Sequence, residues 1–135
     1  MSHGSCVFCD IVAGLRPAAI VHETDTTLAF LDQSQVNAYH TLVIPKQHYT
    51  DVFAIPLGEW VDVMAAVKHV ADLYREKLSL DAVEILNCSG AAAQQAVFHL
   101  HVHIVPRHAG DGQDTHWRTH PELQQHFSSM LDRIR

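Results

Sequence analysis

Residues 98–107 read FHLHVHIVPR, and these alternating histidines constrain the fold more than any other part of the sequence. Successive side chains on a β-strand point to opposite faces, so an extended run places His99, His101 and His103 on one face. The opposite face would carry the apolar residues Phe98, Leu100, Val102 and Ile104. A helix would spread the three imidazoles over about 200° of arc and leave the apolar residues without a common side. The pattern therefore predicts a strand with the three histidines on a functional face and the apolar residues on a face that packs in the core.

Three imidazoles on one strand face are open to three interpretations. The first is a solvated strand that happens to be rich in histidine. The second is a metal platform, because histidines at positions i and i+2 can direct two nitrogens at one ion. In the third, one imidazole is a nucleophile or base, and its neighbours orient it and bind developing charge. The rest of the sequence is needed to choose among them.

Composition limits the class of protein. The chain has 135 residues and a mass of 15.1 kDa, of which 47% are hydrophobic and 18% charged, as expected for one soluble domain. A formal charge of −6 with only 9 Lys and Arg argues against binding to long nucleic acids. No apolar run approaches the roughly 20 residues of a membrane span, and the first residues lack a basic segment followed by an apolar one. We therefore expect a cytoplasmic protein with no membrane partner.

Short, mainly apolar runs predict four further strands, and apolar residues at helical spacing predict three helices. The strands are expected at residues 20–23, 27–31, 40–45 and 82–89, and the helices at residues 6–13, 59–78 and 121–134. The middle helix is the longest, with apolar residues at steps of three and four. Pro106 has no N–H to donate, so it is expected to end the histidine strand. Strands mostly joined without crossover helices indicate an antiparallel sheet with helices packed against it, and hence an α+β fold.

Three cysteines are present, two of them close together. Cys6 and Cys9 form a CxxC pair near the start, whereas Cys88 stands alone in an apolar strand. A redox CxxC would follow a strand and open a helix, and no strand is expected before Cys6. Half of a zinc site is therefore the better interpretation of the pair. Cys88 is interpreted as a small buried residue.

Several separate segments of the sequence resemble the histidine triad (HIT) family. The run HLHVHIV at residues 99–105 is similar to the family signature, three histidines separated by single apolar residues. The runs CVFCDIVAG at 6–14, LAFLD at 28–32 and HTLVIPKQH at 40–48 also look like family segments. The resemblance covers about residues 6–108 of a single domain, residues 1–135, with residues 109–135 as a C-terminal loop and helix. It implies a HIT-like antiparallel meander sheet, a homodimer and a purine mononucleotide site beside the triad.

The resemblance also implies roles for individual residues. His101 corresponds to the family's nucleophile, and His40 to the histidine that backs the triad. His103 and the Gln95 amide are expected to meet the charge that builds on the phosphoryl oxygens. The matching nucleotide-binding positions are Asp32 for the ribose, Asn87 and Gln95 around the phosphate, and Phe8, Ile11 and Phe30 in the base pocket, with His101 and His103 at the phosphate.

These features predict a nucleotidyl hydrolase or transferase that cleaves a purine nucleotide at its α-phosphate, in a phosphoramidate or a similar conjugate. Imidazole has a reference pKa near 6.5, so it is a neutral nucleophile at pH 7. A hydrogen bond from Nδ1–H of His101 to a backbone carbonyl would fix its tautomer and leave Nε2 free to attack. A covalent nucleotidyl-histidine would form, and water would then release the monophosphate.

A metal site is also expected, and it would use His99 from the same strand. Cys6, Cys9, His48 and His99 make a Cys₂His₂ set, and some bacterial relatives hold a structural zinc at the matching positions. Four protein ligands would close the ion to catalysis. The sequence therefore predicts a structural zinc and no metal requirement for the chemical step.

Two departures from the family pattern leave the leaving group open. Gln94 stands where relatives commonly have glycine, and Ala96 stands where the Hint branch has a serine. The alternatives are a dinucleoside polyphosphate hydrolase of the same fold, suggested by residues 106–111, and a nucleotide-binding scaffold with little turnover. A further alternative is a cupin-like or carbonic-anhydrase-like metalloenzyme that uses the HxH pattern.

Overall fold

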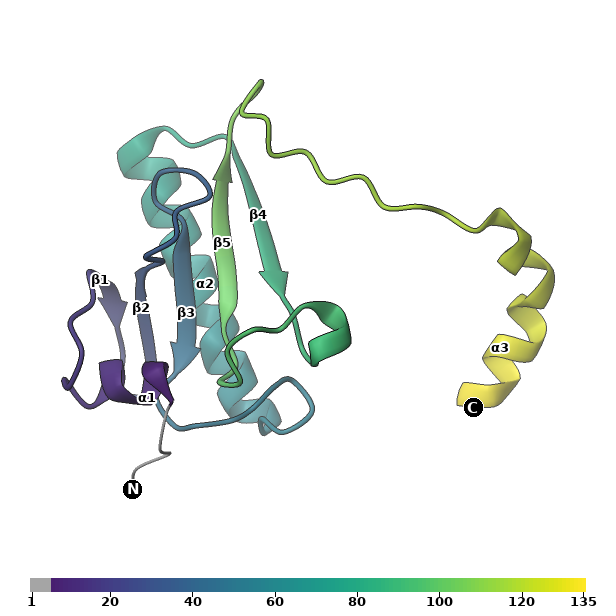
Figure 1. Cartoon of the computed structure of the whole chain (residues 1–135), viewed down its shortest axis with the longest axis horizontal. Helices are drawn as coiled ribbons and strands as arrows, with labels where there is room; N and C mark the ends of the chain where they lie inside the picture. Colours follow the sequence, from purple (N-terminus) through teal and green to yellow (C-terminus); the bar gives the residue numbers. More distant parts are fainter. Residues whose placement is uncertain (1–5) are drawn as a thin grey trace.

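A computed structural model describes residues 6–135, so the first five residues of the predicted domain lie outside the described part. Its sheet has five antiparallel strands in the order β1-β2-β3-β5-β4 (Figure 1). The strands are β1 (Ile20–Glu23), β2 (Thr27–Leu31), β3 (Thr41–Pro45), β4 (Ala82–Asn87) and β5 (Val102–Arg107). The predicted α+β fold with an antiparallel sheet is confirmed, and β1 and β2 have the predicted bounds.

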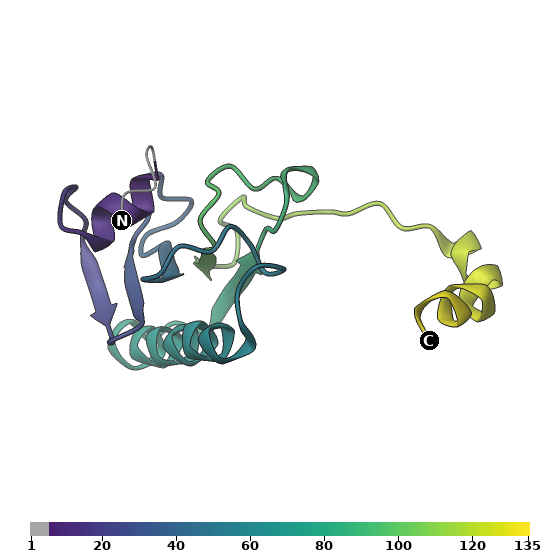
Figure 2. The ribbon, with the colours of Figure 1, turned by 90° about the horizontal axis from the view of Figure 1, so that it is seen from below.

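Helices cover the two faces of the sheet differently. Helix α2 (Leu57–Leu78) lies along one face and the short α1 (Val7–Val12) lies on the other, as Figure 2 shows. Helix α2 begins two residues before the predicted Glu59. It ends at Leu78 as predicted, and the next residue, Ser79, caps it in a left-handed conformation with φ 53°. The buried side of α2 has the predicted helical spacing and consists of Val63, Ala66, Val67, Val70 and Tyr74.

Alternation along the strands produces two cores, one on each face. The core beneath α2 includes Ala29, Val43, Leu100, Val102 and Ile104. The core beneath α1 consists of Phe8, Leu28, Phe30, Leu42 and Ile44. Neighbouring residues of one strand thus serve opposite faces, as the period of two requires. Because His103 is paired with Leu42 across β3 and β5, it lies on the α1 face.

The histidine strand is shorter than predicted. Strand β5 begins at Val102, so His99 and His101 precede it. Alternation still holds there, because Leu100 is fully buried and its N–H donates to the Tyr49 carbonyl at 2.7 Å. Phe98 was expected in the core, but 49% of its surface is exposed. Phe98 lies before this anchored stretch, at the end of the preceding loop.

Proline does not end β5 as expected. Pro106 pairs with Val83 of β4, and the strand continues to Arg107. Pairing of β5 with β3 stops at the Thr41 and Ile104 pair, so the proline has a strand neighbour on one side only. Pro106, which has no N–H, is tolerated there because strand β5 is not paired with β3 at this position.

Residues 88–101 connect β4 to β5 and approach the α1 face. Strand β4 ends at Asn87, two residues before the predicted end. The following loop, predicted as irregular, contains one 3₁₀ turn, η1 (Ala91–Ala93). After it the chain returns to the sheet at Leu100.

The C-terminal arm projects away from the sheet (Figure 1). The predicted terminal helix starts as a 3₁₀ helix, η2 (Pro121–His126), and continues as α3 (Phe127–Ile134). The root of the arm is held by Arg107, whose guanidinium donates to Asp111 and to Asp114 at 2.8–2.9 Å. Apolar side chains of the arm are exposed, among them Phe127, Met130, Leu131 and Ile134. Within residues 6–135, no helix combines the length and apolar character needed to span a membrane.

Candidate active site and metal centre

A cavity of about 880 Å³ lies on the α1 face of the sheet. His101 and His103 line it together with Asp32, from the end of β2. Its apolar wall includes the predicted base-pocket residues Phe8, Ile11 and Phe30. The rings of Phe8 and His101 lie edge to face with centroids 5.2 Å apart. Two of the three sequence histidines and the predicted apolar wall therefore meet in one cavity large enough for a nucleotide.

The tautomer of His101 is fixed by the backbone. Its Nδ1 lies 2.8 Å from the His99 carbonyl oxygen, and a carbonyl can only accept a hydrogen bond. The proton of neutral His101 is therefore on Nδ1, which leaves the Nε2 lone pair unprotonated. Burial lowers the pKa of His101 below its ordinary value of 6.5. The ring is thus held in the form a nucleophile requires.

His103 is oriented by a chain of hydrogen bonds that runs through His40. The Val36 N–H donates to Nδ1 of His40 at 3.2 Å, so the proton of neutral His40 is on Nε2. That nitrogen lies 2.9 Å from Nδ1 of His103 and donates to it. The proton of neutral His103 is consequently on Nε2, where it can serve as a donor. Burial, with His101 and His40 nearby, lowers the pKa of His103 to about 4, so the ring is neutral at pH 7.

Gln95 and Asn87 bind the backbone around the site. The Gln95 amide donates to the carbonyls of Thr50 and Val97 and accepts from the Gly90 N–H. Both of its N–H groups are engaged, whereas the predicted role required a donor for phosphoryl oxygens. Asn87 donates to the His101 carbonyl at 3.0 Å. Neither side chain lines the cavity, but each donates to the carbonyl of a residue that does, Asn87 to His101 and Gln95 to Val97.

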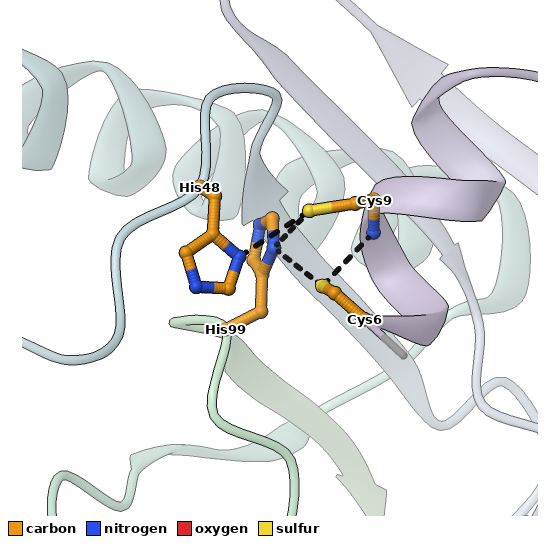
Figure 3. Close-up of side chains that lie close together, drawn as sticks. All are labelled: Cys6, Cys9, His48 and His99. Carbon is orange, nitrogen blue, oxygen red and sulfur yellow. Dashed lines mark hydrogen bonds between the residues drawn. The ribbon is translucent and has the colours of Figure 1, made fainter. Parts of the chain in front are cut away.

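A second cluster joins α1 to the sheet. Cys6 caps α1, and Cys9 lies in its first turns; His48 follows β3, and His99 precedes β5 (Figure 3). The four ligand atoms all lie within 4.8 Å of one another. Nδ1 of His99 lies 3.4 Å from Sγ of Cys6 and 3.5 Å from Sγ of Cys9, and Nδ1 of His48 lies 3.3 Å from Sγ of Cys9. The sequence prediction that these residues converge is confirmed.

The donor set fits a tetrahedral zinc ion. Bonds of about 2.0–2.3 Å place tetrahedral ligands roughly 3.3–3.8 Å apart, which matches the nitrogen–sulfur distances. Nε2 of His99 lies 2.9 Å from the Pro45 carbonyl, so that nitrogen carries the proton and the Nδ1 lone pair faces the sulfurs. Burial and the neighbouring Cys6 raise the pKa of the Cys9 thiol to about 12. A cation is what would convert these crowded thiols to thiolates.

The three histidines do not form one metal platform. His99 faces the cysteines, His101 is bound to a carbonyl, and His103 is bound to His40. Their separate partners argue against the interpretation in which the HxH pattern holds a catalytic ion. The third interpretation, in which neighbours orient one reactive imidazole, agrees best with this geometry.

Sequence reasoning assigned no site role to several residues that line the cavity, among them Arg16, Cys88 and Gln94. Arg16 lies in a loop before Pro17 and belongs to no motif, so no periodicity marked it. Cys88 was expected to be buried in a strand, but it follows β4 and is partly exposed. Gln94 was noted only as a departure from the family pattern.

Gln94 has a left-handed conformation, with φ 71°. A side chain there costs about 1 kcal/mol relative to glycine, because Cβ approaches the following carbonyl oxygen. We expect Gln94→Gly to raise the free energy of unfolding by about 0.5–1 kcal/mol, measured from the denaturant midpoint. The control is Ala92→Gly in the neighbouring 3₁₀ turn, which should lower it by a similar amount. A Gln94→Gly variant less stable than wild type would contradict this prediction.

Comparison with known proteins agrees with this geometry. The HIT domain profile matches residues 14–110. Protein hit of Bacillus subtilis is 42% identical over 138 aligned residues, which cover 94% of this chain and 92% of that protein. Adenylylsulfatase HINT3 of Arabidopsis thaliana is 34% identical over 78% of this chain and 54% of its own length. The crystal structure of a zinc-bound histidine triad family protein from Mycobacterium smegmatis has a TM-score of 0.78, with 36% identity over 97% of this chain and 98% of that one. The chain therefore belongs to the histidine triad (HIT) family of nucleotide-binding hydrolases and transferases.

Proposed function

We propose that this protein cleaves purine nucleotide conjugates at the α-phosphate through a covalent intermediate on His101. The carrying observation is the Nδ1 hydrogen bond to the His99 carbonyl, which leaves Nε2 as the nucleophilic atom beside the cavity. Members of the family bind nucleotides, and one relative is named an adenylylsulfatase, which implies an adenylyl substrate for that protein. The finer substrate class, a phosphoramidate or similar conjugate, follows from the sequence resemblance.

The reaction would have two displacements at phosphorus. In the first, the Nε2 lone pair of His101 forms a bond to the α-phosphorus, and the bond to the leaving nitrogen or oxygen breaks with its electron pair, which takes a proton from solvent. In the second, water attacks the same phosphorus and gives up a proton to solvent, the phosphorus–nitrogen bond breaks, and His101 regains its lone pair. One water is consumed, and a nucleoside monophosphate and the leaving group are released.

Neighbouring residues would stabilise the charge that develops on the phosphoryl oxygens. Nε2–H of His103 is a donor beside His101, with the two ring centroids 5.0 Å apart. Donors aimed at developing charge contribute about 3 kcal/mol each. Asp32 would bind the ribose hydroxyls, and the cavity wall of Phe8 and Phe30 would hold the base. Gln95 and Asn87 would act through the backbone that they position.

We further propose that zinc at Cys6, Cys9, His48 and His99 is structural. When bound, it would supply folding free energy and hold α1 against the sheet. The chemical step needs no electrons or Lewis acid from it, because the histidine attacks directly. This assignment agrees with the zinc-bound relative and with the fit of the donor atoms.

A homodimer is also part of the proposed function. Strand β4 is an edge strand with apolar side chains exposed on both faces, including Val83, Ile85 and Leu86. Such an edge is a template for pairing with another chain, and an antiparallel pair about a two-fold axis would cover both copies equally. The exposed apolar side of α3 would also be covered in such an assembly.

The alternatives receive less support. Residues 106–111 suggested a dinucleoside polyphosphate hydrolase, but Arg107 and Asp111 in this run bind each other at the root of the C-terminal arm. A scaffold with little turnover would not need a nucleophile held in one tautomer. We therefore place the phosphoramidate-type activity first.

The deciding experiment traps the intermediate. Purified protein is mixed with adenosine and guanosine 5′-phosphoramidates, quenched with base, and the peptide containing His101 is examined by mass spectrometry. A nucleotidyl mass on that peptide, formed before steady release of the monophosphate, is expected. Diadenosine tetraphosphate in a parallel reaction tests the dinucleoside alternative. Tight monophosphate binding with no adduct and no turnover would favour the scaffold instead.

The pH dependence of kcat/KM should follow from His101. The neutral ring is reactive, and its folded pKa is lowered below 6.5, so protonation removes the nucleophile only at pH values below that. We expect kcat/KM to stay level from about pH 8 to pH 6.5 and to fall with further acidification. An acidic limb centred above pH 7 would contradict a lowered pKa at the nucleophile.

A further inference from the structure

Arg16 is a cation without a partner at the wall of the cavity. It lines the cavity, its side chain is exposed, and it makes no hydrogen bond or ion pair within residues 6–135. Apart from the two histidines, it is the single basic residue among the described lining residues, and Asp32 is the single acidic one. By contrast, Arg107 is bound to Glu84, Asp111 and Asp114. An unpaired guanidinium beside a ligand cavity is available to a ligand.

Helix α1 shows at which end of the cavity Arg16 lies. Phe8, near the start of α1, packs 5.2 Å from the His101 ring. Arg16 follows the opposite end of the helix, after the turn at Gly14, whose N–H donates to the Ile11 carbonyl. The chain then runs beside β2, because the Ala19 carbonyl accepts the Leu31 N–H at 3.0 Å. Arg16 therefore lines the cavity from beyond the end of α1 opposite to Phe8, the residue that contacts the His101 ring.

A nucleotide whose α-phosphorus lies at His101 would extend toward Arg16. The ribose would lie at Asp32, and the base would lie beyond it, between the apolar side chains of Ile11 and Phe30. Those side chains cover the faces of a purine and do not distinguish one purine from another. The edge of the base would meet the guanidinium, and the edge is where purines differ.

We propose that Arg16 selects guanine over adenine at this site, which makes guanosine conjugates the preferred substrates of the proposed function. Arginine offers only donors, in a planar fork. Guanine presents two acceptors on one edge, O6 and N7, and this pair accepts both prongs. Adenine presents N7 beside the N6 amino donor, which opposes the second prong. This inference rests on the proposed function for its substrate class.

The test compares guanosine and adenosine 5′-phosphoramidates on wild type and three variants. Wild type is expected to prefer guanosine in kcat/KM by about 10–100-fold, the discrimination of one bidentate arginine contact. Arg16→Leu should abolish the preference by lowering guanosine turnover and leaving adenosine turnover within about two-fold. Arg16→Lys keeps the charge without the fork, so it should lose most of the preference. Arg75→Leu, on the exposed side of α2, is the control and should retain it.

Several results would overturn the inference. Equal kcat/KM for both bases in wild type would do so, as would an equal loss on both bases in Arg16→Leu, which would place Arg16 at the phosphate. Full preference in Arg16→Lys would also contradict a bidentate contact. Calorimetric binding of GMP and AMP asks the same question without turnover, so a failure of the proposed chemistry is distinguished from a failure at Arg16. Tighter GMP binding that is lost in Arg16→Leu is the expected result there.

Discussion

Replacing His101 with alanine is expected to lower turnover of a nucleoside phosphoramidate by at least about 10³-fold and to remove the trapped adduct. The reason is that the variant lacks the atom that bonds to phosphorus, while His103 and the cavity wall remain. Turnover is measured by release of the monophosphate, with mass spectrometry for the adduct. His103→Ala should be less severe, with a loss of about 10²–10³-fold, because it removes a donor and leaves the nucleophile.

Folding must be checked, because His101 is buried and its carbonyl accepts from Asn87. The backbone carbonyl is kept in the alanine variant, so monophosphate binding and the melting transition should remain close to those of wild type. His116→Ala, in the exposed linker of the C-terminal arm, is the matched control and should keep full activity. A His101→Ala variant that is folded and turns over at more than a tenth of the wild-type rate would rule out the covalent mechanism.

Much of the fold was predictable because it depends on local alternation. Two short runs joined by a polar link predicted β1 and β2, and apolar residues at steps of three and four predicted α2 and the side that it buries. Alternation along the histidine run put His101 and His103 on one face, whereas the place of Asp32 beside them came from the family resemblance. Convergence of the cysteines with His48 and His99 came from the family resemblance rather than from spacing, because these residues are up to 93 positions apart.

What the sequence could not predict depends on hydrogen bonds between distant segments. Gln95 was expected near phosphate from the family resemblance, and no sequence pattern indicated that its amide would donate to the carbonyls of Thr50 and Val97. Nothing in composition or periodicity tells a buried amide which partner it will have. Phe98 and the late start of β5 have a similar cause, since Leu100 is anchored by the Tyr49 carbonyl rather than by a strand. Arg16 was missed because a loop residue with no motif has no period to follow.

Removing one cysteine of the metal cluster should abolish zinc binding and strongly lower the melting temperature. We expect wild type purified without a histidine tag to hold close to one zinc per chain, and Cys9→Ser to hold none. A ligand present at about 1,000 times its dissociation constant adds roughly 4 kcal/mol to stability. One kcal/mol corresponds to at least about 2–4 °C in a domain of this size, so the melting temperature should fall by about 10 °C or more. Metal is measured by elemental analysis and melting by calorimetry.

Cys88→Ser is the control for the loss of a thiol, because Cys88 lies outside the cluster; it should keep the zinc and most of the stability. Equal melting temperatures for Cys9→Ser and Cys88→Ser, or zinc retained by Cys9→Ser, would exclude a structural ion. His99 also links the metal centre to the reaction, because its ring faces the sulfurs and its carbonyl accepts from Nδ1 of His101. Chelation at a temperature where the chain stays folded should therefore lower kcat by less than about 10-fold, since the ion acts on His101 only through this backbone contact. A loss as large as that of His101→Ala would instead mean that the ion takes part in the chemical step.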